Sequence, residues 1–185
     1  MRLFVALTLP EEVREQLAEL EDRLPGARWV PPENFHITLR FIGEVDGGLA
    51  EDIDAELAAM AGEGFLVSIA GLGCFGEGPR TRALYARVAP SEPLTRLKLK
   101  VENALQRAGC EPEGRKFKPH VTLARFKGQS GPELERFLVR HSLFRAGPFA
   151  VADFALIQSF LSGEGSIYRE EAIYPLARPK LAVGA

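Results

Sequence analysis

Residues His36-Ile37-Thr38-Leu39 have a near-copy later in the chain, His120-Val121-Thr122-Leu123. The copies extend over residues 36–43, HITLRFIG, and residues 120–128, HVTLARFKG, and the second carries one extra residue, Ala124. The chain contains only three histidines, and two of them open these copies. Because both copies hold His, Thr, Leu, Arg, Phe and Gly in the same order, we interpret them as a repeat that organises both fold and function.

Each copy is typical of a β-strand whose two faces differ in chemistry. Alternate side chains of a strand share a face, so His36 and Thr38 are expected on one side. Ile37, Leu39 and Phe41 are expected on the other side, and the second copy repeats the arrangement. Each strand therefore offers an imidazole and a hydroxyl on one face and apolar anchors on the other.

The arginines of the two copies differ in phase. Strict alternation places Arg40 on the face of His36, although an outward, solvated position is an equally good expectation. Ala124 shifts the second copy by one residue, so that Arg125 would point away from His120. A β-bulge at Ala124 would absorb the extra residue and return Arg125 to the face of His120, and we take this as our hypothesis.

The composition is that of an ordinary soluble globular protein. With 185 residues, 46% of them hydrophobic, and a net charge of −2, we expect one domain or two small lobes that share a cleft. No apolar run approaches the roughly 20 residues that span a bilayer, so no membrane association is expected. Cys74 and Cys110 have neither metal-site nor redox spacing, which predicts reduced thiols in a cytoplasm. Residues 115–127 hold basic residues and no acid, which favours a phosphate-facing patch over a solvated strand edge.

Hydrophobic periodicity predicts strands and helices that are interspersed along the chain. The expected strands cover residues 2–8, 28–30, 35–43, 65–75, 81–89, 116–126, 149–160 and 166–175. The expected helices cover residues 10–24, 49–61, 92–108 and 131–141, with Ser91 and Ser130 as caps of the last two. Two pairs of strands flank glycine-rich turns and predict hairpins, so we expect an α+β fold with antiparallel sheets.

The repeat predicts two similar lobes with one histidine strand in each. No segment rich in Gly, Ser or Pro separates the halves, so the lobes are expected to pack as one unit. We predict a single domain over residues 1–178 and a loose C-terminal tail at residues 179–185. The expected oligomeric state is a monomer.

A pair of histidines suits in-line attack on a phosphodiester. One neutral imidazole takes a proton from the nucleophile, while a protonated one gives a proton to the leaving oxygen. Threonine hydroxyls can donate to the phosphate oxygens, and an arginine can neutralise the phosphate charge. This scheme needs no metal and no cofactor, and the two histidines lack an Asp, Glu or Cys cluster at ligand spacing. The third histidine, His141, lies at a predicted helix end and is interpreted as a surface residue.

With these residues the sequence resembles the 2H phosphoesterase superfamily, which is named for two His-x-Thr/Ser-x motifs. It is most similar to the bacterial and archaeal RNA 2′,3′-cyclic phosphodiesterases, also called 2′-5′ RNA ligases. The similarity covers nearly the whole chain, through residues 2–6, 28–44, 118–125, 158–161 and 165–168. It implies a bilobal α+β fold in which each lobe has an antiparallel sheet flanked by helices, with an active-site cleft between the lobes.

The resemblance also implies an activity, the hydrolysis of RNA 2′,3′-cyclic phosphate ends, for example on tRNA fragments, to a 2′-phosphate. Carried onto this chain, His36 would be the proton donor to the departing 3′ oxygen, and His120 would be the proton acceptor that activates water. Thr38 and Thr122 would hold the phosphate. Arg125 matches an arginine that follows the second motif in relatives and is a further phosphate-binding candidate. The reverse reaction, with a 5′-hydroxyl in place of water, would be an ATP-independent 2′-5′ ligation.

Two other functions compete with this one. Another 2H activity, such as cleavage of 2′-5′-linked oligonucleotides or of a small cyclic nucleotide, would use the same residues. A non-catalytic module that binds RNA ends would keep the phosphate contacts without turnover. Among the neighbouring residues, Phe41 and Phe126 are expected in the core, and Ser159 and Tyr168 in buried hydrogen bonds rather than in the cleft.

Overall fold

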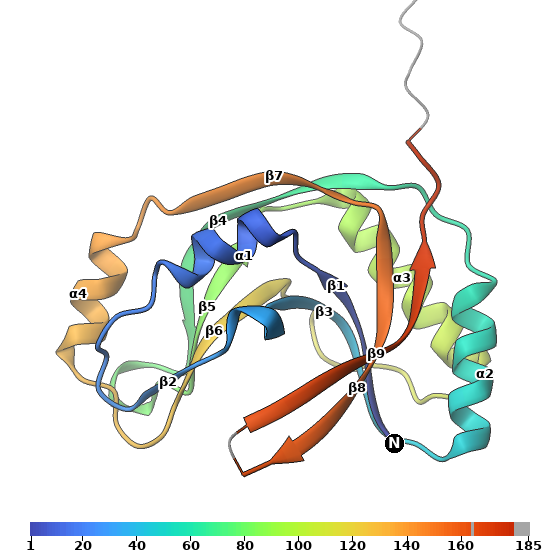
Figure 1. Ribbon diagram of the computed structural model, residues 1–185, viewed down its shortest axis with the longest axis horizontal. Coiled ribbons are helices and arrows are strands. Elements are labelled where there is room, and N and C mark those ends of the chain that lie inside the picture. The colour runs from blue at the N-terminus through green and yellow to red at the C-terminus, as the bar shows by residue number, and fades with distance from the viewer. Residues whose placement is uncertain (164, 180–185) are drawn as a thin grey trace, which may run out of the picture.

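Two antiparallel β-sheets form the frame of the molecule, and each contains one histidine strand. The computed structural model describes residues 1–163 and 165–179. The first sheet has the strand order β3-β1-β8-β9 and the second the order β2-β6-β5-β4-β7 (Figure 1). The strands of the first sheet are β1 (Arg2–Thr8), β3 (His36–Glu44), β8 (Asp153–Ser162) and β9 (Gly165–Pro175). Those of the second are β2 (Ala27–Trp29), β4 (Phe65–Phe75), β5 (Ala83–Val88), β6 (His120–Phe126) and β7 (Arg145–Val151).

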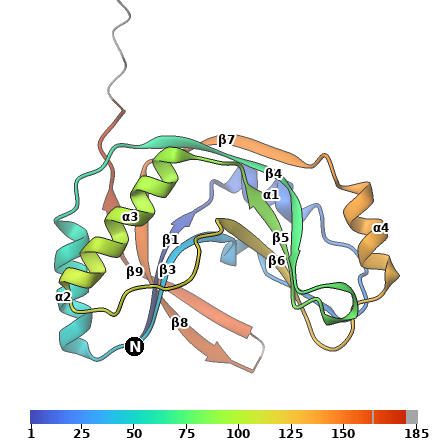
Figure 2. The ribbon, with the colours of Figure 1, turned by 180° about the vertical axis from the view of Figure 1, so that it is seen from behind.

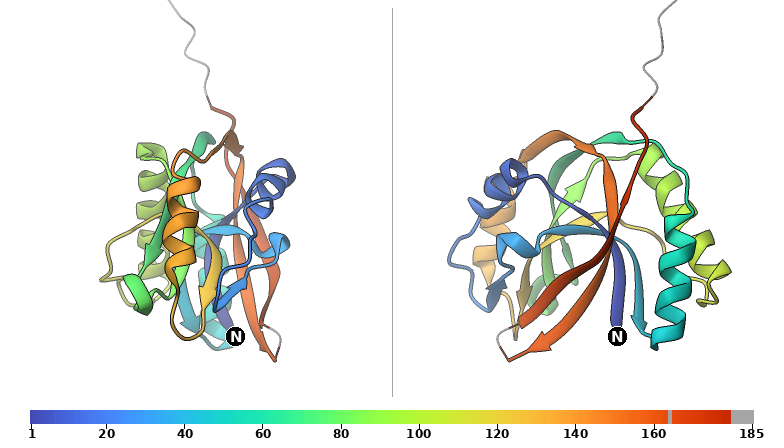
Figure 3. Two further views of the ribbon diagram at one scale, coloured as in Figure 1. Left: turned by 90° about the vertical axis from the view of Figure 1, so that its left-hand side faces the viewer. Right: turned by 45° about the vertical axis from the view of Figure 1, so that its right-hand side comes forward.

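The α-helices of the described residues lie around these sheets. They are α1 (Glu11–Ala18), α2 (Gly47–Ala58), α3 (Glu92–Arg107) and α4 (Pro132–Arg140). α2 and α3 pack against each other on one side of the molecule, and α4 lies at the opposite end (Figures 1 and 3). As the sequence predicts, Ser91 caps α3, where its hydroxyl oxygen accepts the N–H of Leu94 at 3.2 Å. Within the described residues no helix is both long and apolar enough to cross a membrane.

The predicted bilobal α+β fold is confirmed, and the two lobes share one core. β3 and β6 are in contact near the middle of the molecule (Figure 2). One continuous apolar cluster runs through both sheets and includes Leu7 and Ile37 from the first, and Leu84 and Val121 from the second, all without solvent exposure. The single domain predicted over residues 1–178 stays a prediction, and of the predicted tail, residues 180–185 lie outside the described residues.

The first helix is shorter than its apolar spacing predicts. α1 ends at Ala18 rather than at residue 24, and the N–H of Leu20 bonds instead to the carbonyl of Leu17, three residues back. Leu20 and Leu24 are nevertheless buried, so the loop uses the same apolar residues that a longer helix would have used. The apolar spacing thus correctly predicts the burial of Leu20 and Leu24 but wrongly predicts that they are helical.

The C-terminal half also departs from prediction. The cap of α4 is Gly131, because the hydroxyl of Ser130 donates to the carbonyl of Gly78 at 2.6 Å. His141, expected on the surface, is half-buried with its ring centroid 4.5 Å from that of Phe137. β6 begins at residue 120 instead of 116, and residues 149–160 are divided between β7 and β8, which belong to different sheets.

The hypothesis of a bulge in β6 is confirmed by its pairing with β5. Tyr85 pairs with Thr122 and Leu84 pairs with Ala124, so Leu123 is the unpaired extra residue. Leu123 and Ala124 are both buried, as two consecutive inward residues of a bulge should be.

β3 contains the same bulge, which the sequence did not reveal. Ala6 pairs with Thr38 and Val5 pairs with Arg40, which leaves Leu39 unpaired. As far as Phe41 the two copies therefore match residue for residue without a gap, and the expectation that Ala124 breaks their symmetry is wrong. Arg40 is the counterpart of Ala124, and Phe41 is the counterpart of Arg125.

Candidate active site

The imidazole of His36 is held by the loop that leads into β3. Its Nδ1 lies 2.7 Å from the carbonyl oxygen of Asn34. A carbonyl can only accept, so Nδ1 carries a proton and Nε2 is the nitrogen free for proton transfer. The ring lies between two aromatic side chains, with centroids 5.0 Å from Phe4 and 5.3 Å from Tyr168. Tether and packing together fix the orientation of the ring.

His120 is held in the same way in the other lobe. Its Nδ1 lies 2.6 Å from the carbonyl oxygen of Lys118, again two residues earlier in the chain. Its ring centroid lies 4.9 Å from that of Phe75 and 5.2 Å from that of Tyr85. The two imidazoles therefore have the same kind of backbone support, and both rings have Nε2 free.

Both imidazoles have a lowered pKa. Burial is the main cause for His36, and the hydrogen bond to Asn34 partly opposes it, while the nearby His120 and Arg125 lower the pKa further. Burial also lowers the pKa of His120, with the Lys118 carbonyl opposing and the charges of Arg125 and Lys118 adding to the effect. Arg125 thus lies close enough to influence both rings.

A pocket of about 300 Å³ opens beside His36. Its wall includes His36 and Thr38 from β3, Arg125 from β6 and Tyr168 from β9. The bulge in β6 lets Arg125 reach this pocket, and the charge of Arg125 also lies near His120, on whose face the hypothesis placed it. His120 does not line this pocket. Arg125 does line it, and its positive charge lies close to both histidines.

Thr38 and Thr122 occupy equivalent positions beside the two histidines. Both are half-buried and follow their histidine by two residues, so each hydroxyl lies on the face of its imidazole. Thr38 lines the pocket, whereas Thr122 does not. In the part of the chain that the structure describes, no protein hydrogen bond engages either hydroxyl, which leaves both able to donate to a ligand.

Phe41 was expected in the core but belongs to the pocket. The bulge at Leu39 reverses the phase of β3, so Phe41 returns to the face of His36, where 44% of it is exposed. The guanidinium of Arg2 lies 5.2 Å from the Phe41 ring and also lines the pocket. Sequence reasoning missed Arg2, although its alternation with Phe4 along β1 could have indicated it.

Ser159 and Tyr168, expected in buried hydrogen bonds, are half-buried and line the pocket instead. They come from neighbouring strands, β8 and β9, and form a cross-strand pair. Because paired residues of a sheet point to the same face, the β8–β9 hairpin supplies one side of the site.

Arg40 is buried away from the site, so neither expected position for it is correct. Only 9% of it is exposed. Its Nε lies 2.9 Å from a carboxylate oxygen of Glu102, its Nη1 lies 3.5 Å from Glu113, and its Nη2 donates to the carbonyl of Glu111 at 2.5 Å. Arg40 thus joins β3 to α3 and to the segment that leads into β6.

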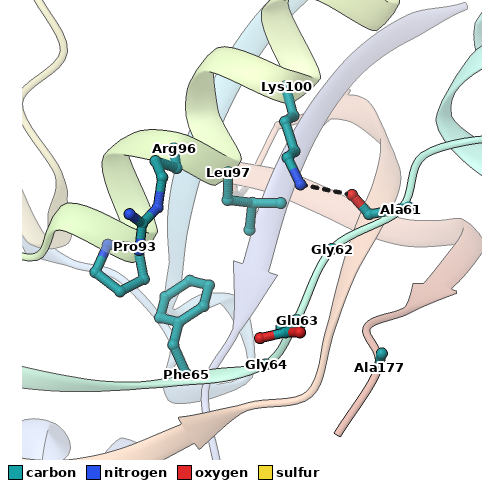
Figure 4. Close-up of a pocket in the computed structure, with 10 residues that line it drawn as sticks. All are labelled: Ala61, Gly62, Glu63, Gly64, Phe65, Pro93, Arg96, Leu97, Lys100 and Ala177. Carbon is teal, nitrogen blue, oxygen red and sulfur yellow. Dashed lines mark hydrogen bonds between the residues drawn. The ribbon is translucent and has the colours of Figure 1, made fainter. Parts of the chain in front are cut away.

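Another pocket, of about 570 Å³, lies between α3 and the segment before β4 (Figure 4). Its two cations are already engaged, since Lys100 Nζ donates to the Ala61 carbonyl at 2.8 Å and Arg96 pairs with Glu92 at 2.9 Å. It shares no residue with the pocket beside His36. Over residues 1–163 and 165–179, no three His, Cys, Asp or Glu side chains gather as metal ligands would.

A family model described as LigT like phosphoesterase matches residues 7–85 and 88–168, which is most of the chain. The chain belongs to this family. The resemblance inferred from the two His-x-Thr motifs is therefore confirmed by a match that spans both lobes.

Relatives and solved structures agree with that assignment. A protein of Aeropyrum pernix named RNA 2′,3′-cyclic phosphodiesterase is 38% identical over 160 residues, which are 83% of this chain and 91% of that protein. A protein of the same name from Archaeoglobus fulgidus is 33% identical over 177 residues, or 94% of this chain and 99% of the relative. The crystal structure of TT0787 from Thermus thermophilus matches with a TM-score of 0.79 and 28% identity, covering 95% and 97% of the two chains. E. coli LigT in complex with 3′-AMP matches with a TM-score of 0.72 and 25% identity, covering the same shares.

Proposed function

We propose that this protein is a metal-independent RNA 2′,3′-cyclic phosphodiesterase, which opens the cyclic phosphate at an RNA end to a 2′-phosphate. The observation that carries the proposal is the pair of imidazoles, one from each lobe, that share the same Nδ1 tether and leave Nε2 free. The names of the relatives from Aeropyrum pernix and Archaeoglobus fulgidus support the substrate.

In the proposed reaction His120 is the proton acceptor and His36 is the proton donor. Nε2 of His120 takes a proton from water, and the water oxygen forms a bond to phosphorus. The bond between phosphorus and the 3′ oxygen breaks, and Nε2–H of His36 protonates that oxygen, which leaves a 3′-hydroxyl and a 2′-phosphate. The two rings regain their starting protonation by exchange with solvent. Which histidine is donor and which is acceptor comes from the family resemblance.

The phosphate would be held by Thr38, Thr122 and Arg125. Charge-assisted hydrogen bonds from Arg125 neutralise the developing negative charge, and the two hydroxyls donate to the non-bridging oxygens. Burial lowers the pKa of both imidazoles in the free protein. A bound phosphate anion opposes that shift and favours the protonated form that the donor needs.

The wild-type protein, given RNA that ends in a 2′,3′-cyclic phosphate in the presence of EDTA, tests the proposal. The expected product carries a 2′-phosphate. Binding without turnover would show an RNA-end-binding module instead. Turnover confined to 2′-5′-linked oligonucleotides or to a small cyclic nucleotide would show another 2H activity, and loss of turnover in EDTA would contradict the metal-free scheme.

Further features of the proposal concern the cell. We expect a monomer that works in the cytoplasm on RNA fragments, those of tRNA included. Cys74 and Cys110 are free thiols, which suits a reducing compartment. If a 5′-hydroxyl replaces water, the same proton transfers join its oxygen to phosphorus and release the 3′ oxygen as a hydroxyl, which gives 2′-5′ ligation without ATP.

A further inference from the structure

A groove of about 710 Å³ continues from the pocket beside His36. The two share Arg125, Leu161, Ser166 and Tyr168, so they form one continuous surface. The groove runs between the segment that contains β2 and the β8–β9 hairpin. A ligand anchored at the histidines and longer than one nucleotide therefore has this groove as an extension.

Arg28 is the distinctive residue of this groove. It pairs directly with Arg125 across strands β2 and β6, so the two guanidinium groups lie on one face of the sheet. Like charges directly opposite each other destabilise a sheet. In the described part of the chain neither arginine has a carboxylate in an ion pair. An anion placed between or beside them would relieve this repulsion.

The opposite wall of the groove contains two exposed apolar side chains. Leu161 and Ile167, near the tip of the β8–β9 hairpin, are 75% and 59% exposed. Trp29 lines the groove from β2, where its indole N–H donates to the carbonyl of Asp22 at 3.0 Å. A cationic strip that faces apolar side chains matches a nucleic-acid strand, which presents phosphates along one edge and bases along the other.

The alternative route away from His36 is less suited to a polyanion. A pocket of about 470 Å³ on the other side of Tyr168 is lined by Glu33 and Glu170. Its cation, Arg169, lies 2.8 Å from Glu171 and is engaged. Glu33 also lines the groove, where the other charged lining residues are two arginines. Charge thus directs an RNA strand toward Arg28.

We propose that Arg28 binds the phosphodiester that precedes the terminal cyclic phosphate, and that Arg125 lies between the two phosphates. The preceding nucleoside then lies against Leu161 and Ile167. The inference rests on the proposed function and deepens it, because it makes the substrate an oligoribonucleotide end rather than a 2′,3′-cyclic mononucleotide.

The test compares 2′,3′-cyclic AMP with a dinucleotide that ends in the same cyclic-phosphate adenosine. The wild-type protein should have the higher kcat/KM on the dinucleotide. In Arg28→Ala the ratio of the two kcat/KM values should fall by roughly tenfold to a hundredfold, the effect of one charge-assisted hydrogen bond. Arg145→Ala, which removes an exposed arginine from β7 at the far edge of the same sheet, is the matched control and should leave the ratio unchanged.

A dinucleotide with an uncharged methylphosphonate linkage isolates the phosphate contact. The wild-type protein should lose most of its preference for this substrate, and Arg28→Ala should show little further loss, because the two changes remove the same contact. Equal losses of kcat/KM on mononucleotide and dinucleotide in Arg28→Ala, or an unchanged ratio, would overturn the inference.

A binding measurement separates this inference from the proposed function. Trp29 is the only tryptophan of the chain, so its fluorescence reports on the groove. A dinucleotide ending in a 2′-phosphate should bind the wild-type protein more tightly than 2′-AMP, and Arg28→Ala should remove that advantage whether or not the protein turns over any cyclic phosphate. Equal affinities in the wild-type protein would overturn the subsite.

Discussion

His36 and His120 share a tether but differ in their surroundings. The residue after the bulge is Phe41 on the strand of His36 and Arg125 on the strand of His120, and both side chains face the site. Lys118 adds a second cation near His120. The two nearly identical motifs thus differ in the side chain that follows the bulge and in the additional cation near His120, which is a physical basis for unequal roles.

The pH dependence of catalysis should change when Arg125 is replaced. Its positive charge lowers the pKa of both histidines, so in Arg125→Gln both pKa values should rise. Both limbs of the bell-shaped profile of kcat/KM should then move to higher pH, since this profile reports the free enzyme. The maximal kcat/KM should fall roughly tenfold to a hundredfold with the lost phosphate contact.

Arg145→Gln is the control, because it removes an exposed arginine on β7 and should move neither limb. A profile of Arg125→Gln that coincides with the wild-type profile would show that Arg125 does not act on the imidazoles.

At this scale the sequence predicts the residues of the repeat well and their neighbours poorly. The histidines and threonines follow from the motif and from strand alternation. Ser159 and Tyr168 carry no such signal, because what brings their hairpin to His36 is the pairing of β8 with β1, between residues more than a hundred positions apart.

At the scale of elements, the bulge in each histidine strand decides which side chains reach the site. In β3 it turns Arg40 into the interior, where Glu102 and Glu113 neutralise it. Lys98 also donates to Glu102, at 2.8 Å. One largely buried ionic cluster therefore joins β3, α3 and the segment that precedes β6, and so connects the two histidine strands on the side away from the pocket.

Glu102→Gln should destabilise the protein by about 1.5–3 kcal/mol at neutral pH, because Arg40 and Lys98 lose a charged acceptor, although Glu113 still pairs with Arg40. The pKa of Glu102 is lowered to about 2, since hydrogen bonds from Lys98, from the Glu113 backbone and from Gln106 outweigh its burial. A lowered pKa stabilises the fold above the unfolded value of about 4.3, and that stabilisation is lost as the pH falls toward about 2. The difference in unfolding free energy between wild type and variant should therefore shrink over that range.

Denaturant unfolding at several pH values measures this difference. The exposed pair Glu92–Arg96 provides the control, and Glu92→Gln should cost less than about 1 kcal/mol at any pH. A Glu102→Gln variant as stable as the wild-type protein at pH 7 would contradict the role assigned to the cluster.

The sequence predicts one of the two bulges and misses the other for a physical reason. In β6 the extra Ala124 makes the second copy look longer than the first, which indicates a bulge. In β3 the bulge at Leu39 is set by the register with β1, and no residue count reveals it. Aligning Arg40 with Arg125 by residue type is therefore misleading, because Arg40 points into the interior and Arg125 points into the pocket.

At the scale of the whole molecule, each sheet supplies one histidine, and a shared core fixes the distance between them. The apolar cluster includes residues of both sheets and of all four α-helices of the described residues. β2 joins the lobes further, because it lies between α1 and β3 in sequence and yet pairs with β6 in the second sheet. The geometry of the site therefore depends on both lobes being folded and packed.

Thermal unfolding should accordingly show a single cooperative transition. We expect the calorimetric and van't Hoff enthalpies to agree, and the loss of near-UV and far-UV circular dichroism to coincide. Two resolved transitions would show that the lobes fold independently and that the shared core does not couple them.

Two antiparallel lobes could be predicted from the repeat, the hairpin turns and the family resemblance. The pairing of β2 with β6 in the second sheet could not be predicted, because a strand of three residues has too short a pattern to indicate a partner almost a hundred positions away. The division of residues 149–160 between two sheets was missed because the apolar residues continue across the break.

The most direct test of the whole account is the rate at which His36→Ala and His120→Ala hydrolyse RNA that ends in a 2′,3′-cyclic phosphate, measured in EDTA. Each variant should lose at least about 10²-fold to 10⁴-fold in kcat, the worth of one positioned proton transfer, with an unfolding temperature close to that of the wild-type protein. His141→Ala, whose ring packs on Phe137 and not at the site, should retain the rate and serves as the control. Full activity in either His36→Ala or His120→Ala would contradict the two-histidine mechanism.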